Sequence, residues 1–111
     1  MSTVFGKIIA GELPAEKVFE NERIIVIKDI APKAPVHLLF IPKKEIVSLQ
    51  VMQKQDFALF AEIIELAQKL AKEYGVEDGY RFLTNVGGHA GQTVFHLHFH
   101  LIGGTPLGGM A

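Results

Sequence analysis

The chain has 111 residues, of which 49% are hydrophobic and 21% are charged, and its formal net charge at pH 7 is −1. This length and composition predict a single domain, residues 1–111, with an ordinary packed core. The balanced charge argues against a dedicated nucleic-acid or anionic-membrane surface. The absence of cysteine excludes thiol nucleophiles, disulfides and cysteine-ligated zinc. The first residues lack the apolar core of a signal peptide and no run resembles a membrane span, so we expect a soluble, cytoplasmic protein.

The first part of the chain predicts one short helix followed by three strands. Residues 3–10 form the helix, capped by Ser2 or Thr3, and strands follow at 17–20 and 23–28. The second of these strands is almost continuously apolar and β-branched, which is typical of a strand covered on both faces. Two prolines then keep the chain extended, and a third strand over 36–42 is closed by Pro42.

The second part of the chain is dominated by a long helix. It runs from about Gln53 to Tyr74, and Gly75 follows at a position that favours a helix C-cap. Its apolar residues cover about half the circumference, whereas a helix on one sheet needs a stripe of about 100°, and the surplus indicates a homodimer. The remaining predicted elements are a strand over 80–85, a glycine-rich loop over 85–92 and a final strand over 93–102. Helices and antiparallel strands in this order predict an α+β fold with helices packed on a sheet.

Three of the five histidines alternate in the predicted final strand, at His96, His98 and His100. Strand geometry places these histidines and Val94 on one face. The other face is then a core face, made of Phe95, Leu97, Phe99 and Leu101. Imidazoles on alternate positions can converge on one small object, so the arrangement suits a metal ion or an anion. A polar strand face exposed to water is the third reading.

The surroundings of the histidines favour phosphate over a metal. No residue from 80 to 111 is acidic, although metal-bound histidines are usually oriented by carboxylates behind them. The preceding segment, NVGGHAGQT, contains three glycines, which let backbone N–H groups approach an anion closely. A neutral imidazole beside a phosphate can attack phosphorus and form a labile phosphoramidate that water cleaves. The sequence therefore favours phosphoryl chemistry, with metal binding as the remaining alternative.

Several segments together resemble one known family. The stretch GQTVFHLHFHLIGG resembles the histidine triad (HIT) motif, and FGKIIAGELPA and KDIAPKAPVHLLFIPKK resemble the branch of histidine triad nucleotide-binding proteins. The resemblance covers nearly the whole chain. It implies a HIT-like α+β fold, in which an antiparallel five-stranded sheet carries one long and one short helix and extends across a homodimer.

The same resemblance implies a function. Members of this branch are hydrolases of purine nucleoside phosphoramidates and aminoacyl adenylates, acting at the α-phosphate through a nucleotidyl-histidine intermediate and releasing AMP or GMP. The implied partners are a purine nucleotide and a second copy of the chain, with no cofactor required, no metal, no nucleic acid and no membrane. Two alternatives stay open: a dinucleoside polyphosphate hydrolase, because GQTV also occurs in that branch, and a nucleotide-binding regulatory module with little catalysis.

By position in the motif, the resemblance gives the histidines unequal roles. His98 is the nucleophile, His96 and His100 orient and polarise the site, and His37 is their partner on the neighbouring strand. The positions that match the family's nucleotide contacts are Asp29 for the ribose, Asn85, Gly91, Thr93 and Val94 for the phosphate, and Ile8, Leu13, Ile27, Ile30 and Leu39 for the apolar walls around the base. Gln92 is also among the expected nucleotide-binding positions.

The chain departs from the branch pattern at three places, one of which is Glu45, at a position that is sometimes a histidine in the branch. Thr93 stands where the branch often has serine, which keeps the hydroxyl and adds a methyl group. The tail TPLGGMA resembles bacterial members and lacks the Trp-Pro-Pro-Gly ending of animal ones. That tail commonly shapes the leaving-group side of the site, so the sequence leaves the identity of the leaving group open.

Overall fold

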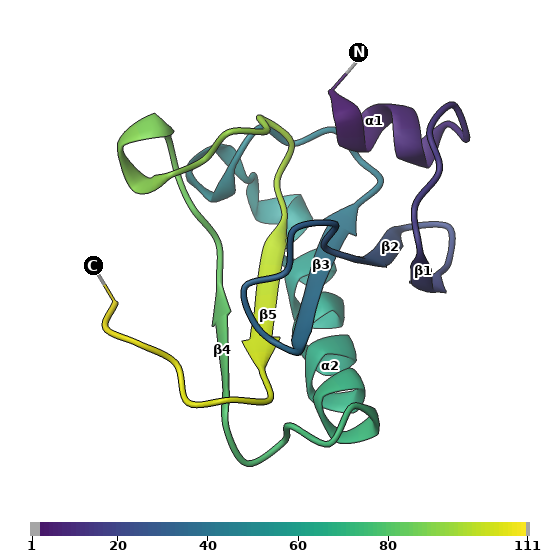
Figure 1. Ribbon diagram of the computed structural model, residues 1–111. Helices are drawn as coiled ribbons and strands as arrows, with labels where there is room; N and C mark the ends of the chain where they lie inside the picture. The colour runs from purple at the N-terminus through teal and green to yellow at the C-terminus, as the bar shows by residue number, and fades with distance from the viewer. Residues whose placement is uncertain (1–2, 111) are drawn as a thin grey trace.

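A computed structural model describes residues 3–110 of the chain (Figure 1). Its helices are α1 (Val4–Ile9) and α2 (Phe57–Glu73), its strands are β1 (Lys17–Glu20), β2 (Ile24–Lys28), β3 (Val36–Pro42), β4 (Tyr80–Leu83) and β5 (Phe99–Gly103), and its 3-10 turns are η1 (Leu49–Val51), η2 (Lys54–Asp56) and η3 (Gly88–Ala90). The order of helices and strands is the one predicted from the sequence. Neither helix in the described part is long and apolar enough to cross a membrane.

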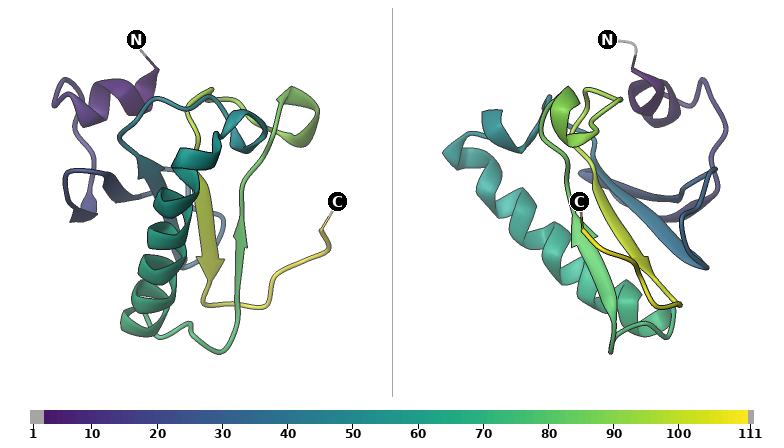
Figure 2. Two further views of the ribbon diagram at one scale, coloured as in Figure 1. Left: turned by 180° about the vertical axis from the view of Figure 1, so that it is seen from behind. Right: turned by 60° about the vertical axis from the view of Figure 1, so that its left-hand side comes forward.

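The five strands form one sheet in the order β1-β2-β3-β5-β4, and every neighbouring pair is antiparallel. Helix α2 lies along one face of this sheet, and α1 covers one end of the opposite face (Figure 2). The predicted α+β fold with a five-stranded antiparallel sheet is therefore confirmed. Because α1 covers only part of its face, the remainder is available for a binding site.

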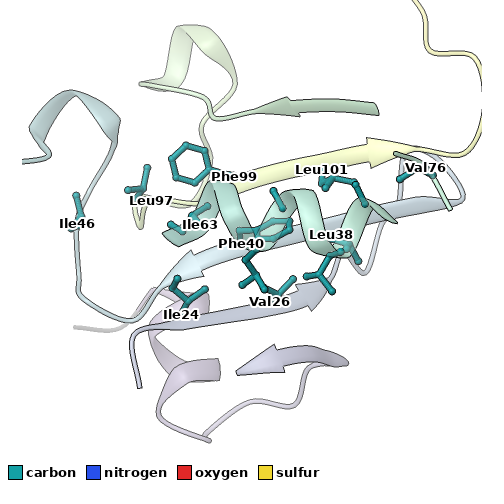
Figure 3. Packing of buried hydrophobic residues seen from close by; sticks show 14 residues of the cluster. Ile24, Val26, Leu38, Phe40, Ile46, Ile63, Val76, Leu97, Phe99 and Leu101 are labelled. Atoms are coloured by element: carbon teal, nitrogen blue, oxygen red, sulfur yellow. The ribbon is translucent and has the colours of Figure 1, made fainter. Parts of the chain in front are cut away.

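The main core fills the space between the sheet and α2 (Figure 3). Val26 of β2, Phe40 of β3 and Leu101 of β5 are fully buried against the helix. On the opposite face of β2, Ile25 and Ile27 pack with residues of α1. The prediction that the second strand is covered on both faces is confirmed, which explains its nearly continuous apolar sequence.

Residues at the ends of α1 and α2 account for where each helix begins and ends. The Thr3 hydroxyl accepts a hydrogen bond from the Gly6 N–H at 3.0 Å, as predicted for α1, while the alternative cap Ser2 lies outside the described residues. Helix α2 begins at Phe57, four residues later than predicted, because the Asp56 carboxylate accepts from the Gln53 N–H at 2.9 Å and closes a separate 3-10 turn. Gly75 follows α2 with φ +73°, in the left-handed conformation expected of a C-cap glycine.

The wide apolar stripe of α2 is mostly absorbed by the sheet. Five of its residues are buried in the core: Ile63, Leu66, Ala67, Leu70 and Ala71. Leu59, Phe60 and Tyr74 are partly buried against the same core, and Ile64 remains 39% exposed. The stripe therefore does not by itself require a second partner for the helix.

The final strand begins later than predicted, and the reason lies on β3. Strand β5 begins at Phe99, so the expectation of a strand from residue 93 is wrong for 93–98, and Phe95 is 48% exposed and does not lie on a core face. The last pair between β3 and β5 is Phe40 with Phe99. Two residues further along β3 stands Pro42, which has no N–H to donate to the ladder. The segment before Phe99 bends and is held by the chain that follows β3, with the Leu97 N–H bonded to the Ile46 carbonyl.

Candidate functional site

A pocket of about 430 Å³ opens on the sheet face that carries α1. Its lining comes from α1 and the loop after it, from β2 and β3, and from two histidines. The predicted site residues that line it are Ile8, Leu13, Ile27, Asp29, Ile30, Leu39, Thr93, Val94, His98 and His100. The structure thus brings most of the predicted base, ribose and phosphate positions into one pocket, and it places His37 and His96 behind the lining.

His98 is held in one tautomer by a backbone carbonyl. Its Nδ1 lies 2.8 Å from the carbonyl oxygen of His96, and a carbonyl can only accept, so Nδ1 carries the proton. The bend that precedes β5 makes this local contact possible. Phe5 of α1 packs edge-on against the ring with a centroid separation of 4.8 Å. In the neutral ring, Nε2 is therefore left with its lone pair available.

His37 and His100 form a directed chain of hydrogen bonds. The backbone N–H of Lys33 donates to Nδ1 of His37 at 3.0 Å, so the proton of the neutral His37 ring is on Nε2. That Nε2 lies 2.9 Å from Nδ1 of His100 and donates to it. The proton of His100 is then on its own Nε2. A pocket lined by both rings has a lone pair at Nε2 of His98 and an N–H donor at Nε2 of His100.

His96 is the most enclosed of the three alternating histidines. It is 2% exposed, and its Nε2 donates to the Pro42 carbonyl at 2.7 Å. Its Nδ1 is buried without a hydrogen-bond partner among the described residues. The ring thus attaches the bend to the end of β3 and holds in place the carbonyl that orients His98. The three imidazoles are therefore not evenly spaced along one strand as expected. His96 anchors the bend, and His98 and His100 line the pocket.

Asp29 links the pocket to the His37 ring. Its Oδ1 accepts from the Ala31 N–H at 2.8 Å, which fixes the turn after β2, and its Oδ2 lies 3.4 Å from Nε2 of His37. The backbone N–H of Asp29 also donates to the His37 carbonyl at 3.0 Å. Each carboxylate oxygen has more than one lone pair. The side chain can therefore keep these contacts and still accept from hydroxyl groups in the pocket.

Burial keeps the pocket histidines neutral. It lowers the pKa of His100 to about 4, with the neighbouring His98 and His37 lowering it further, and burial likewise lowers the pKa of His98 and of His37. An unfolded histidine titrates near 6.5, so the unfolded chain binds the proton first as the pH falls. The contribution of His100 to stability is therefore complete above pH ~6.5 and is lost as the pH falls toward 4. At neutral pH the two pocket rings are uncharged, as nucleophilic attack requires.

Asp29, His37 and His100 form the one metal-like cluster within the described residues, with ligand atoms all within 4.8 Å of one another. The hydrogen bond from Lys33 opposes metal binding there. A metal at Nε2 of His37 would require the ring proton on Nδ1, where it would meet the Lys33 N–H. Metal-bound histidines normally donate from their other nitrogen, whereas this one accepts. The donor set fits a hydrogen-bond chain better than a metal ion.

The glycine-rich loop lies beside the pocket and not in its lining. Gly91 has φ +100°, and a Cβ there would lie 4.0 Å from the Asn85 amide nitrogen, so these two predicted phosphate positions face each other. Gln92 departs most from expectation. Its side chain is buried, accepts from the Gly87 N–H at 2.8 Å and donates to the Val47 carbonyl at 2.8 Å. Gln92 therefore fixes the loop to the chain after β3, and its side chain does not reach the pocket.

Three contributions to the site were missed in the sequence. Phe5 lines the pocket, and its spacing to Ile8 on a short helix was the available signal. The Lys33 N–H and the Pro42 carbonyl fix two histidine tautomers, but both are backbone groups. No side-chain pattern identifies them, because any residue at position 33 except proline supplies the same N–H.

The residues from 10 to 107 match the model of the HIT domain family. The chain belongs to this family. It is 53% identical over all 111 residues to an uncharacterized HIT-like protein of Chlamydia muridarum, of which it covers 88%. It is 54% identical over 109 residues to a HIT-like protein of Chlamydia pneumoniae, and this match covers 98% of this chain and 99% of that protein.

Solved HIT structures have the same fold. A HIT family hydrolase from Clostridium thermocellum superposes with a TM-score of 0.92 at 47% identity, over 98% of this chain and 96% of that one. A histidine triad protein from Clostridium difficile gives a TM-score of 0.93 at 37% identity, over 100% of this chain and 97% of that one. The HIT family resemblance recognised in the motif is thereby confirmed.

Imidazole ¹⁵N NMR tests the pKa of His100 and the tautomer of His98 directly. We expect the His100 signals to titrate with a midpoint near pH 4, because burial disfavours its charged form, and His98 to show an Nδ1–H tautomer at neutral pH. Comparison with a His100→Asn variant assigns the signals. A His100 midpoint near 6.5, or an Nε2–H tautomer of His98, would contradict the geometry.

Proposed function

We propose that the protein is a hydrolase that acts at the α-phosphate of purine nucleotides, cleaving nucleoside phosphoramidates and aminoacyl adenylates through a nucleotidyl intermediate on His98. The observation that carries this proposal is the 2.8 Å hydrogen bond from Nδ1 of His98 to the His96 carbonyl, which leaves a neutral Nε2 as nucleophile in the pocket. The similar proteins described as HIT family hydrolases support the same reaction class.

The reaction proceeds in two displacements at phosphorus. In the first, Nε2 of His98 attacks, the P–N bond breaks, and the amine leaves with a proton taken from solvent. The Nδ1–H of His98 remains bonded to the His96 carbonyl, which stabilises the imidazolium that forms. Nε2–H of His100 donates to a phosphoryl oxygen, oriented by His37. In the second step, water attacks phosphorus and gives a proton to solvent, the bond to His98 breaks, and the nucleotide and the neutral His98 ring are released.

The rest of the pocket suits a nucleoside. The end formed by α1 and the following loop has only apolar side chains, Val4, Phe5, Ile8, Leu13, Pro14 and Ala15, so a base is held there by packing. Packing alone favours a large purine over a pyrimidine and distinguishes adenine from guanine poorly. Asp29 lines the same pocket, with Oδ2 3.4 Å from Nε2 of His37, and its carboxylate can accept from both ribose hydroxyls.

Substitution of the proposed nucleophile tests the mechanism. We expect His98→Asn to lower kcat for amine release from an adenosine phosphoramidate by about a thousandfold or more, because no other lone pair is positioned at phosphorus. AMP binding, measured by calorimetry, should persist. His89→Asn, which changes an exposed histidine outside the pocket, is the matched control. Undiminished turnover by His98→Asn would contradict the proposal, and a wild-type protein that binds AMP without turning over any substrate would instead favour a regulatory module.

Removal of metal tests the role of the Asp29–His37–His100 cluster. We expect chelator-treated, metal-free protein to retain full kcat/KM, because the Lys33 N–H occupies Nδ1 of His37 and keeps the proton on Nε2. The measurement is turnover with metal content determined on the same sample. Activity that is lost on chelation and restored by zinc would assign a catalytic metal to this cluster.

The free edge of β4 supports a homodimer, which we propose as the assembled form. β4 pairs with β5 on one side, its four residues are all half-buried, and its register has no irregularity. The other sheet edge, β1, has a register shift between Lys17 and Phe19 and an ion pair from Lys17 to Glu20, features that discourage pairing. A second copy pairing along β4 would extend the sheet across the dimer.

Sedimentation equilibrium and hydrogen exchange together test this assembly. We expect a mass twice the 12.2 kDa of the chain at micromolar concentration, with β4 amides protected on both edges of the strand. The outward amides of β1 should exchange rapidly and serve as the internal control. A monomeric mass, or fast exchange along the outer edge of β4, would exclude this interface.

A further inference from the structure

The register of the sheet places an arginine beside the pocket histidines. Across β3, β5 and β4, His37 is paired with Ile102 and Ile102 with Arg81, while the adjacent row contains His100 paired with Leu83. Directly paired residues share a face of an antiparallel sheet, so Arg81 projects on the same face as His37 and His100. Arg81 is the diagonal neighbour of His100, at about 7–8 Å between Cα atoms, which is within reach of an arginine side chain.

This part of the sheet face is not covered by a helix. Helix α1 packs over β2 and β3, where it contacts Ile25, Ile27, Leu39 and Ile41. Over β5 and β4 the same face has no helix against it (Figure 2), and Arg81, Leu83 and Ile102 are half-exposed. A ligand whose phosphate lies at His98 and His100 can therefore extend past His100 onto this surface.

Arg81 is a cation on that side of the site, in addition to Lys33, whose charge acts on the His37 ring. Lys28 lines the pocket, but its Nζ is paired with Glu16 at 2.8 Å. Arg81 is in no ion pair within the described residues, and its Nη2 donates to the Gly108 carbonyl of the exposed tail at 2.9 Å. A guanidinium has five N–H donors, so most of them remain for a ligand. No residue from 80 to 111 is acidic, so neither its own strand nor β5 pairs it with a carboxylate.

The order of residues along β5 places Arg81 beyond His100 as seen from His98. In phosphoryl transfer the nucleophile and the leaving group lie roughly in line on opposite sides of phosphorus. β5 runs from Phe99, next to His98, through His100 to Ile102, which is paired with Arg81. A group that leaves past His100 therefore meets the row that contains Arg81.

We propose that Arg81 forms a leaving-group subsite that selects substrates whose leaving group bears an anion, either a carboxylate or a further phosphate. This inference rests on the proposed function and adds the substrate class that the sequence leaves open. Bidentate hydrogen bonds from a guanidinium suit both anions. Arg81 also holds the tail through Gly108, so the tail borders the subsite without supplying a charge.

A pair of matched substrates tests the subsite. Adenosine 5′-phosphoramidate of β-alanine carries a carboxylate, and the corresponding β-alanine methylamide derivative is neutral and similar in shape. We expect Arg81→Gln to lower the acidic-to-neutral ratio of kcat/KM by about tenfold while leaving turnover of the neutral substrate unchanged. Arg23→Gln is the control, because Arg23 pairs with Glu62 of α2 on the other side of the sheet and should leave the ratio unchanged.

Two further measurements identify the anion and distinguish failure of the subsite from failure of the proposed hydrolase function. Diadenosine triphosphate replaces the acidic amidate in one arm: loss confined to the amidate assigns a carboxylate, and loss confined to the polyphosphate assigns a phosphate. In the wild type, the acidic-to-neutral ratio should also fall as salt rises from about 0.05 to about 0.5 M, a readout that does not depend on the folding of a variant. Ratios unchanged by both Arg81→Gln and salt would overturn the subsite. Failure of the wild type to hydrolyse even the neutral amidate would instead overturn the proposed function.

Discussion

Pro42 lacks an amide hydrogen, and the local structure of the site follows from that. The ladder between β3 and β5 ends at Phe40 and Phe99, and the chain before Phe99 is free to bend. In the bend, the ring of His96 donates to the Pro42 carbonyl, and the carbonyl of His96 accepts from His98. In a regular continuation of the ladder Leu97 would stand opposite Pro42, which has no N–H to donate to the Leu97 carbonyl. Because the ladder ends there, the chain can bend so that the His96 carbonyl accepts from the ring of His98.

Burial and backbone hydrogen bonds divide the control of the histidines between them. Burial against Phe5 and neighbouring rings lowers their pKa and keeps them neutral. Backbone groups then decide which nitrogen carries the proton: the His96 carbonyl for His98 and the Lys33 N–H for His37. Neither effect alone would be sufficient, since a neutral ring of the wrong tautomer has no lone pair toward the pocket and a charged ring has none at all.

The sequence predicted the fold almost completely because its signals were local. The apolar run of β2, the Thr3 cap, Gly75 after α2 and the breaker at Pro42 each follow from one element's own residues. The failures came from long-range contacts. The strand was extended to residue 93 because alternation of FHLHFHL fits a strand, and the loss of a pairing partner on β3 is not visible in that stretch. Gln92 faced inward because the chain after β3 offered it a carbonyl, which no local pattern indicates.

The bond from Lys33 to His37 has a consequence for how this site tolerates change. The direction of the chain through His37 and His100 begins at a main-chain N–H in the loop after β2. Nineteen of the twenty genetically encoded residues supply that group at position 33, so the polarity of the relay is insensitive to almost any codon change there. Side chains at position 33 can therefore change while the ring protons of His37 and His100 keep their positions. Only proline would remove the N–H that holds them there.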